Sequence, residues 1–301
     1  MTAVADIMLK AHELGLGVPA FNIPYLPMVE PVCKAVKAAD SFSLVEVARP
    51  EWMKFQAKSL AAVAEEFGKW ADRDHVRLHL DHVPVIDEDH RRVDYLPIFR
   101  EAVSLGYESL MIDGSRLPLD ENIRATAQVA EFGHTHGCPV EAELGAVLGH
   151  ETGPLPPYEE LFASGKGFTD IEEARRFAQE SGCDWLSVAV GNIHGAIADG
   201  ARDQKKVEAR LNLERLAQLS EATGRPLVLH GGSGIKREHV LDSFKYGITK
   251  VNVGTEIRQA YEQALRATND VEAAQQACYD RTYNLLVEFF CIAGIQKQVV
   301  G

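Results

Sequence analysis

The sequence predicts an α/β protein of the (β/α)₈, or TIM-barrel, class with an extra helical segment at its C-terminal end. Two observations lead to this prediction. Short β-branched and apolar runs alternate with longer stretches in which apolar residues return every three or four positions, which is the helical period. There are eight short runs, each followed by a helical stretch, as a closed parallel barrel requires. The 301 residues suffice for one barrel, so we expect a single domain over residues 1–301. An open, doubly wound parallel sheet stays the alternative, because periodicity cannot show closure.

The expected strands and helices follow in order along the chain. Strands are predicted at Val18–Asn22, Leu44–Ala48, Val76–Leu80, Glu108–Ile112, Pro139–Leu144, Trp185–Val190, Pro226–His230 and Thr249–Val253. Helical patterns cover Met28–Ala39, Lys54–Phe67, Leu96–Leu105, Asn122–His134, Ile171–Glu180, Leu211–Glu221 and Arg237–Phe244. Capping residues support several of these helices, since Asp170 precedes Ile171 and Gly106 follows Leu105.

Residues 270–301 are expected to form the extra helical segment. Leu285, Leu286, Phe289 and Phe290 give it an apolar stripe that must pack against something. Two interpretations stay open, a helix that caps the barrel and a contact with another subunit.

Composition and charge narrow the classes of partner. With 44 acidic and 31 basic residues the formal net charge is -13, which repels nucleic acid and anionic membrane surfaces. No apolar run approaches the roughly 20 residues that cross a bilayer. Asp6 and Glu13 interrupt the N-terminal apolar pattern, which is therefore not that of a signal peptide. The five cysteines are scattered without a C-x-x-C pair, which favours a reducing compartment. We expect a cytoplasmic protein that acts on a small molecule.

The unusual polar residues gather at the C-terminal ends of the predicted strands. In a barrel, the loops that follow these ends share one mouth, where the chemistry is placed. The clusters are Asn22, His79-Leu80-Asp81-His82, Asp113-Gly114-Ser115, Glu141-Ala142-Glu143, Gly191-Asn192-Ile193-His194-Gly195, His230-Gly231-Gly232-Ser233-Gly234 and Asn252-Val253-Gly254-Thr255. This coincidence predicts a catalytic or binding site at the mouth.

Three histidines of these clusters suggest a metal. His82, His194 and His230 follow three different strands, and a catalytic zinc ion takes three protein ligands and an open position. Strand alternation turns His79 and Asp81 toward the barrel interior. The spacing alone leaves open whether the histidines bind a metal or have structural roles.

Two glycine-rich turns suggest a phosphate site. Gly231–Gly234 and Asn252–Thr255 lie at the seventh and eighth strands, where backbone N–H groups and a helix N-terminus can hold a phosphate without lysine. An acidic protein could bind a phosphorylated substrate in this way. Any single glycine could instead serve a tight turn with positive φ.

Taken together, these motifs resemble the class II, zinc-dependent ketose-bisphosphate aldolases of the fructose- and tagatose-bisphosphate type. The resemblance runs from Ala20-Phe21-Asn22 to Arg258 and is carried by H-L-D-H at 79–82, S-L-M-I-D-G-S at 109–115, V-E-A-E-L-G at 140–145, G-x-x-H-G at 191–195, H-G-G-S-G at 230–234 and N-V-x-T-E at 252–256. It implies a (β/α)₈ barrel that reversibly cleaves a ketose 1,6-bisphosphate, or a related phosphoketose, to dihydroxyacetone phosphate and an aldehyde.

The resemblance also implies roles for individual residues. His82, His194 and His230 match the zinc ligands, and Asp113 and Glu143 match positions that hold a second or displaced divalent ion in some relatives. Asp81 matches the general acid/base at the C4 hydroxyl, and Glu151 matches an acid on a mobile loop. A monovalent cation is a further cofactor to expect. The substrate-binding positions are Asn22, Gly195, Gly231, Gly232, Ser233, Asn252, Val253, Gly254, Thr255 and, for the distal phosphate, Arg258.

The chain departs from the family pattern in ways that bear on the substrate. Relatives usually show Gln and Ser after the second strand, where this chain has Glu46 and Arg49, which either border the mouth and select the aldehyde or pair with each other. Residues 86–92 form a longer, charged insertion that we expect to be a solvated rim loop. Gly254 is a small residue of the tagatose type.

Rival chemistries stay open at this point. A Schiff-base aldolase needs a lysine, and the only one in a predicted strand is Lys250, near the N-terminal end of its strand, which disfavours that route. A zinc-dependent barrel hydrolase would use histidines and carboxylates but not two phosphate turns. A non-catalytic, aldolase-like partner subunit would have no need of Asp81 beside three histidines. A homodimer or homotetramer is expected.

Overall fold

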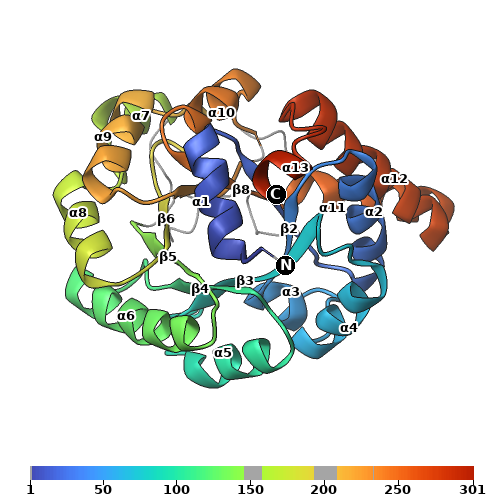
Figure 1. Ribbon diagram of the computed structural model, residues 1–301, viewed down its shortest axis with the longest axis horizontal. Coiled ribbons are helices and arrows are strands. Elements are labelled where there is room, and N and C mark those ends of the chain that lie inside the picture. The colour runs from blue at the N-terminus through green and yellow to red at the C-terminus, as the bar shows by residue number, and fades with distance from the viewer. Residues whose placement is uncertain (1, 146–157, 193–208, 233) are drawn as a thin grey trace.

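The eight strands close into a parallel barrel. The structure is a computed structural model, and it describes residues 2–145, 158–192, 209–232 and 234–301. Each strand pairs with the next in sequence order, and β1 pairs with β8 from Val18 opposite Lys250 to Phe21 opposite Val253. This closing pair confirms the (β/α)₈ prediction and shows that the open-sheet alternative is wrong. Figure 1 shows the helices as a ring around the strands.

The strands lie close to their predicted positions. They are β1 (Val18–Asn22), β2 (Ser43–Ala48), β3 (Val76–Pro84), β4 (Ser109–Asp113), β5 (Val140–Leu144), β6 (Trp185–Val188), β7 (Leu227–Leu229) and β8 (Ile248–Val253). The helices are α1 (Val4–Leu14), η1 (Leu26–Met28), α2 (Val29–Ala38), α3 (Arg49–Met53), α4 (Leu60–Trp70), α5 (Tyr95–Ser104), α6 (Leu119–Thr135), α7 (Tyr158–Ser164), α8 (Ile171–Glu180), α9 (Leu213–Thr223), α10 (Arg237–Phe244), α11 (Thr255–Thr268), α12 (Val271–Asn284), η2 (Leu285–Phe289) and α13 (Gln296–Val299).

The segment after β2 differs from the prediction. One helix over Lys54–Phe67 was expected, but the chain forms the short helix α3 directly after β2 and then α4. Pro50 suits the first turn of α3, and the side chain of Glu51 accepts the N–H of Ala48 at 2.7 Å. The Oγ of Ser59 accepts the N–H of Ala62 at 3.1 Å and so starts α4. These capping contacts start two separate helices, although the apolar spacing over Lys54–Phe67 suggested a single one.

Strand β3 runs four residues beyond the predicted end. Its pairing with β4 shifts register between Leu80 and Val83, which marks a bulge. His82 lies in this irregular step with a φ of 34°, in the left-handed region that residues other than glycine seldom adopt. The bulge therefore sets the direction of a side chain that was singled out as a metal ligand.

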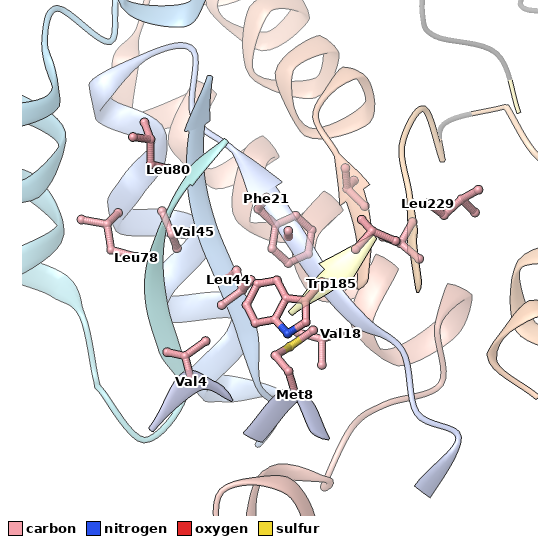
Figure 2. Close-up of a cluster of buried hydrophobic side chains, with 14 of the residues drawn as sticks. Val4, Met8, Val18, Phe21, Leu44, Val45, Leu78, Leu80, Trp185 and Leu229 are labelled. Carbon is pink, nitrogen blue, oxygen red and sulfur yellow. The ribbon is translucent and has the colours of Figure 1, made fainter. Parts of the chain in front are cut away.

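The helix α1 closes the N-terminal end of the barrel. It buries Val4, Ile7, Met8 and Ala11, and in Figure 1 it lies across the barrel opening. Figure 2 shows Met8 next to Trp185 and Val18, in one buried cluster with them. This plug leaves the opposite end, where the strands finish, as the mouth.

The C-terminal extension packs against its own chain. Helix α12 lies along α11 and α2 on the side of the barrel, and α13 contacts α1 (Figure 1). Leu285, Leu286 and Phe290 are buried in the hydrophobic core, and Phe289 packs against it. The predicted apolar stripe is thus covered within the chain, on the barrel side and at the N-terminal end rather than over the mouth.

Two smaller expectations concern cysteines and membrane spans. All five cysteines are free, as their spacing predicted, and all but Cys291 are buried. Among the described residues, every helix is too short or too polar to traverse a lipid bilayer.

Replacing Met8 with alanine tests the plug. Met8 is fully buried, so Met8→Ala should lower the free energy of unfolding by about 2–5 kcal/mol because it leaves a cavity under the barrel. Leu9 is 50% exposed on the same helix, and Leu9→Ala should change stability by less than about 0.5 kcal/mol. Urea denaturation followed by circular dichroism measures both, and equal losses would contradict the role given to α1.

Candidate active site

The closed barrel brings the predicted polar residues to one mouth. Asn22 ends β1, Asp81 and His82 lie in β3, Asp113 ends β4, Glu143 lies in β5, His230 follows β7 and Asn252 lies in β8. Four of the predicted site residues, His194, Glu151, Gly195 and Ser233, lie outside the described residues. The others can be placed by their contacts.

His82 and His230 lie side by side and share carboxylate neighbours. Their ring centroids are 4.4 Å apart. His82 Nδ1 lies 3.3 Å from Asp113 Oδ2 and 3.8 Å from Glu143 Oε2. The same Glu143 oxygen is 2.9 Å from His230 Nδ1, so Glu143 lies between the two rings.

Glu141 is a further carboxylate neighbour of His230. Its Oε1 lies 2.8 Å from His230 Nε2, and both side chains are fully buried. The sequence placed Glu141 in a polar cluster without giving it a role. A carboxylate on one ring nitrogen orients an imidazole so that the other nitrogen can serve as a ligand.

This donor set fits a zinc ion. One atom each from Asp81, His82 and His230, and likewise from His82, Asp113 and Glu143, lie within 4.8 Å of one another. Imidazole nitrogen and carboxylate oxygen are ligands that zinc prefers, and the two overlapping groups are consistent with two neighbouring metal positions.

The electrostatics of both rings also favour a cation. Burial lowers the pKa of His230, but Glu141 and Glu143 outweigh it and raise that pKa to about 10. Burial likewise opposes the charge on His82, but Asp81, Asp113 and Glu143 together outweigh it and raise the pKa of His82 to about 9. The carboxylates thus stabilise positive charge where a metal would bind once the rings lose their protons.

Asp81 is held by two asparagines. Asn22 Nδ2 donates to its Oδ2 at 2.9 Å, and Asn252 Nδ2 donates to its Oδ1 at 3.0 Å. Burial opposes its ionisation, but His82 and Lys250 outweigh burial and hold the pKa of Asp81 well below its usual range. The side chain is therefore an oriented carboxylate directly beside the metal-ligand candidates.

His79 shares the inward face with Asp81, as strand alternation predicted. Its Nδ1 lies 2.8 Å from Ser109 Oγ and its Nε2 lies 3.5 Å from Glu141 Oε2. Burial and Lys250 lower the pKa of His79 to about 3, so it is a neutral group below the site.

Lys250 lies much closer to the site than its sequence position suggested. It aligns with Val18, the first residue of β1, but its ammonium reaches upward to within 3.9 Å of Asp81 Oδ1. Burial opposes the charge, but Glu141 and Glu46 outweigh it and raise the pKa of Lys250 above its ordinary value. A protonated lysine cannot attack a carbonyl, so the Schiff-base route is disfavoured for this reason and not because Lys250 is remote.

Glu46 and Arg49 do not pair with each other, so that interpretation was wrong. Glu46 points into the barrel and lies 3.0 Å from Lys250 Nζ, because β2 alternation turns it inward. Arg49 begins α3 at the rim, where Nη1 lies 3.7 Å from Asp87 Oδ2 of the charged insertion. Arg116 donates to the carbonyl oxygen of Asp87 at 2.7 Å.

Glu51 is a site residue that sequence reasoning missed. Besides the N–H of Ala48, its carboxylate interacts with the side chain of Asn22, the residue that also holds Asp81. Burial raises the pKa of Glu51 to about 8. The signal was available, since a Glu three residues into a helix often turns back to cap the helix start.

The glycine-rich turns of β7 and β8 pack closely together. Gly231 has a φ of 68°, and a Cβ on Gly232 would come within 2.7 Å of Val251 Cγ1. A Cβ on Gly254 would lie 3.3 Å from the side chain of Asn22, which explains the small residue there. Val253 is buried at the end of β8, and Thr255 begins the 14-residue helix α11. The backbone N–H groups of this region can receive an anion.

Arg258 is engaged within its own chain. Its Nη1 lies 3.0 and 2.9 Å from the two carboxylate oxygens of Glu262, which also accepts the hydroxyl of Tyr25 at 2.7 Å. The guanidinium lies over the ring of Phe55. A role at the distal phosphate would require Arg258 to exchange this partner for the substrate.

Known proteins resemble the chain over nearly its whole length. Residues 2–296 match the family described as fructose-bisphosphate aldolase class-II. The YdjI aldolase from Escherichia coli K12 has a similar structure, with 27% identity over 98% of this chain and 99% of that one and a TM-score of 0.77. The fructose-bisphosphate aldolase (Fba) from Campylobacter jejuni shares the fold at 18% identity, with coverage of 95% and 94% and a TM-score of 0.72.

These findings agree with the site geometry and decide among the open chemistries. Family membership favours aldol cleavage over the zinc-hydrolase and non-catalytic alternatives. The chain belongs to the class II fructose-bisphosphate aldolase family and is an aldolase, a carbon–carbon lyase.

Proposed function

We propose that the protein reversibly cleaves a phosphorylated ketose of the 1,6-bisphosphate type to dihydroxyacetone phosphate and an aldehyde. The observation that carries this proposal is the oriented carboxylate of Asp81 beside two paired imidazoles, His82 and His230. His82, His230 and the sequence-matched His194 would hold zinc, and Asp113 and Glu143 would hold a second or displaced ion.

Each residue then has a defined part in the reaction. Asp81 accepts the proton of the C4 hydroxyl, the C3–C4 bond breaks, and its electron pair passes to the fragment that becomes dihydroxyacetone phosphate. A bound zinc ion supplies a Lewis acid for the negative charge that develops on this fragment. Glu151 delivers the proton that C3 requires. Asn22 and Asn252 keep both oxygens of Asp81 in place.

The phosphate of the dihydroxyacetone end would bind the turns of β7 and β8. Gly231, Gly232 and Gly254 have no side chain that could cover the backbone N–H groups there, and Ser233, Gly195 and Thr255 join them in the family pattern. Dipoles rather than side-chain charge would overcome the net charge of -13.

The aldehyde end would be selected at the rim of β2. Arg49 stands there beside Asp87, and Gly254 leaves Asn22 undisturbed as in tagatose-type relatives. We therefore favour a sugar phosphate other than fructose 1,6-bisphosphate. The five free cysteines support a reducing, cytoplasmic setting, and a homodimer or homotetramer is proposed from the family resemblance.

A panel of phosphorylated ketoses tests the proposed reaction. Release of dihydroxyacetone phosphate from fructose and tagatose 1,6-bisphosphates and from longer ketose 1-phosphates should be detectable for at least one compound. Activity should disappear with a chelator and return with zinc. Borohydride added with the substrate should trap nothing; a covalent adduct on a lysine would contradict the zinc mechanism.

His230→Ala should weaken zinc binding. The variant removes one ligand and leaves Glu141 and Glu143 buried without their partner, so we expect zinc affinity to fall at least about 100-fold. Metal titration with a colorimetric zinc indicator measures this. Retention of one tight zinc per chain would remove His230 from the ligand set.

Asp81→Asn should separate metal binding from turnover. The amide keeps the shape of the side chain but cannot accept the C4 proton, so kcat should fall about 100- to 10,000-fold while zinc stays bound. Steady-state kinetics measures kcat, and metal analysis of the same sample measures the zinc that stays bound. Near-normal turnover in the zinc-loaded variant would rule out Asp81 as the base.

A further inference from the structure

The ammonium of Lys250 has three close polar partners inside the barrel. It lies 2.7 Å from Asn252 Oδ1, 2.9 Å from Glu141 Oε2 and 3.0 Å from Glu46 Oε2. The contact with Asn252 is a hydrogen bond, and the two carboxylates are ion-pair partners of the ammonium. Lys250, Glu46 and Glu141 are each 0% exposed, so water does not compete for these contacts.

One of these contacts leads directly to Asp81. Lys250 donates to the oxygen of the Asn252 amide, and the nitrogen of the same amide donates to Asp81 Oδ1 at 3.0 Å. An amide has a donor end and an acceptor end that are nearly equal in shape, so an unanchored asparagine can turn its oxygen toward a neighbour. If the amide of Asn252 turned in that way, its oxygen would face Asp81 Oδ1, and the hydrogen bond to Asp81 would be replaced by repulsion between two oxygens.

We propose that Lys250 is a positioning residue for Asp81 that acts through the amide of Asn252. The inference rests on the proposed function, in which Asp81 accepts the C4 proton. Lys250 fixes the direction of the amide, and the amide fixes one oxygen of Asp81, while Asn22 fixes the other. In this proposal the lysine acts only through Asn252 and is not itself a contact of the substrate or the metal.

A purely structural explanation competes with this one. Lys250 could serve only to neutralise the carboxylates around it, since Glu46, Asp81 and Glu141 all lie within 3.9 Å of its nitrogen. The two explanations differ in what happens when a carboxylate is removed together with the lysine. Charge neutralisation predicts recovery, whereas amide positioning predicts none.

Three variants separate the explanations. Lys250→Met removes the donor at nearly constant length. Glu46→Gln keeps the lysine and its contact with Asn252, and serves as the matched control. The double variant Lys250→Met/Glu46→Gln removes the ammonium together with one of the buried carboxylates that it faces. This variant can be measured in place of Lys250→Met if the single variant folds poorly.

Two reactions are compared for each zinc-loaded variant. The first is cleavage of the best ketose that the wild-type enzyme accepts in the panel. The second is exchange of a hydroxymethyl proton of dihydroxyacetone phosphate, on the carbon that corresponds to C3 of the ketose, in D₂O. This exchange is followed by NMR and does not involve the C4 hydroxyl. A wild-type enzyme that cleaves nothing in the panel would defeat the proposed function itself, before any variant is compared.

Amide positioning predicts a specific pattern. In Lys250→Met and in the double variant, kcat for cleavage should fall about 10- to 100-fold, with KM and proton exchange within about threefold of wild type. Glu46→Gln should cleave at close to the wild-type rate. Recovery of cleavage in the double variant, an equal loss of cleavage and exchange, or unchanged cleavage in Lys250→Met would each overturn the inference.

Discussion

Buried carboxyl groups are the constraint on which the rest of the structure depends. Glu46, Asp81, Glu141 and Glu143 are all buried inside the barrel, and burial raises the pKa of Glu46 and of Glu143. A buried carboxylate without a counter-charge costs several kcal/mol. Lys250 supplies one positive charge, next to Glu46 and Glu141. His82 and His230 supply the second next to Glu143, either as protonated rings or as ligands of a metal ion. The site is therefore arranged around two positions for positive charge.

The closed barrel brings the charged side chains together at one end. Parallel strands end together, so side chains from β3, β4, β5 and β7 meet at one mouth. The bulge in β3 gives His82 a φ of 34° and separates its direction from that of Asp81, its neighbour in sequence. One residue can then face the metal-ligand cluster while the other is held between two asparagines.

The sequence predicted the architecture and the strand ends at which polar side chains gather, because periodicity and strand-end position are local properties. It did not predict how the interior charges pair. Lys250 was judged by its place along β8, but a long side chain carries its charge several ångströms from its own Cα, and only the closed barrel shows where it ends. For Glu46 and Arg49 the sequence left open whether they border the mouth or pair with each other; strand alternation and the start of α3 place them apart. Glu51 was missed because its helix was expected to begin later.

The central claim, that His82 and His230 converge on one zinc ion, is tested most directly by anomalous X-ray diffraction at the zinc edge from crystals of the zinc-loaded protein. The account predicts a single strong peak about 2.0–2.1 Å from a ring nitrogen of each histidine. A strong peak bound elsewhere in the protein, with neither ring in reach of it, would contradict the account.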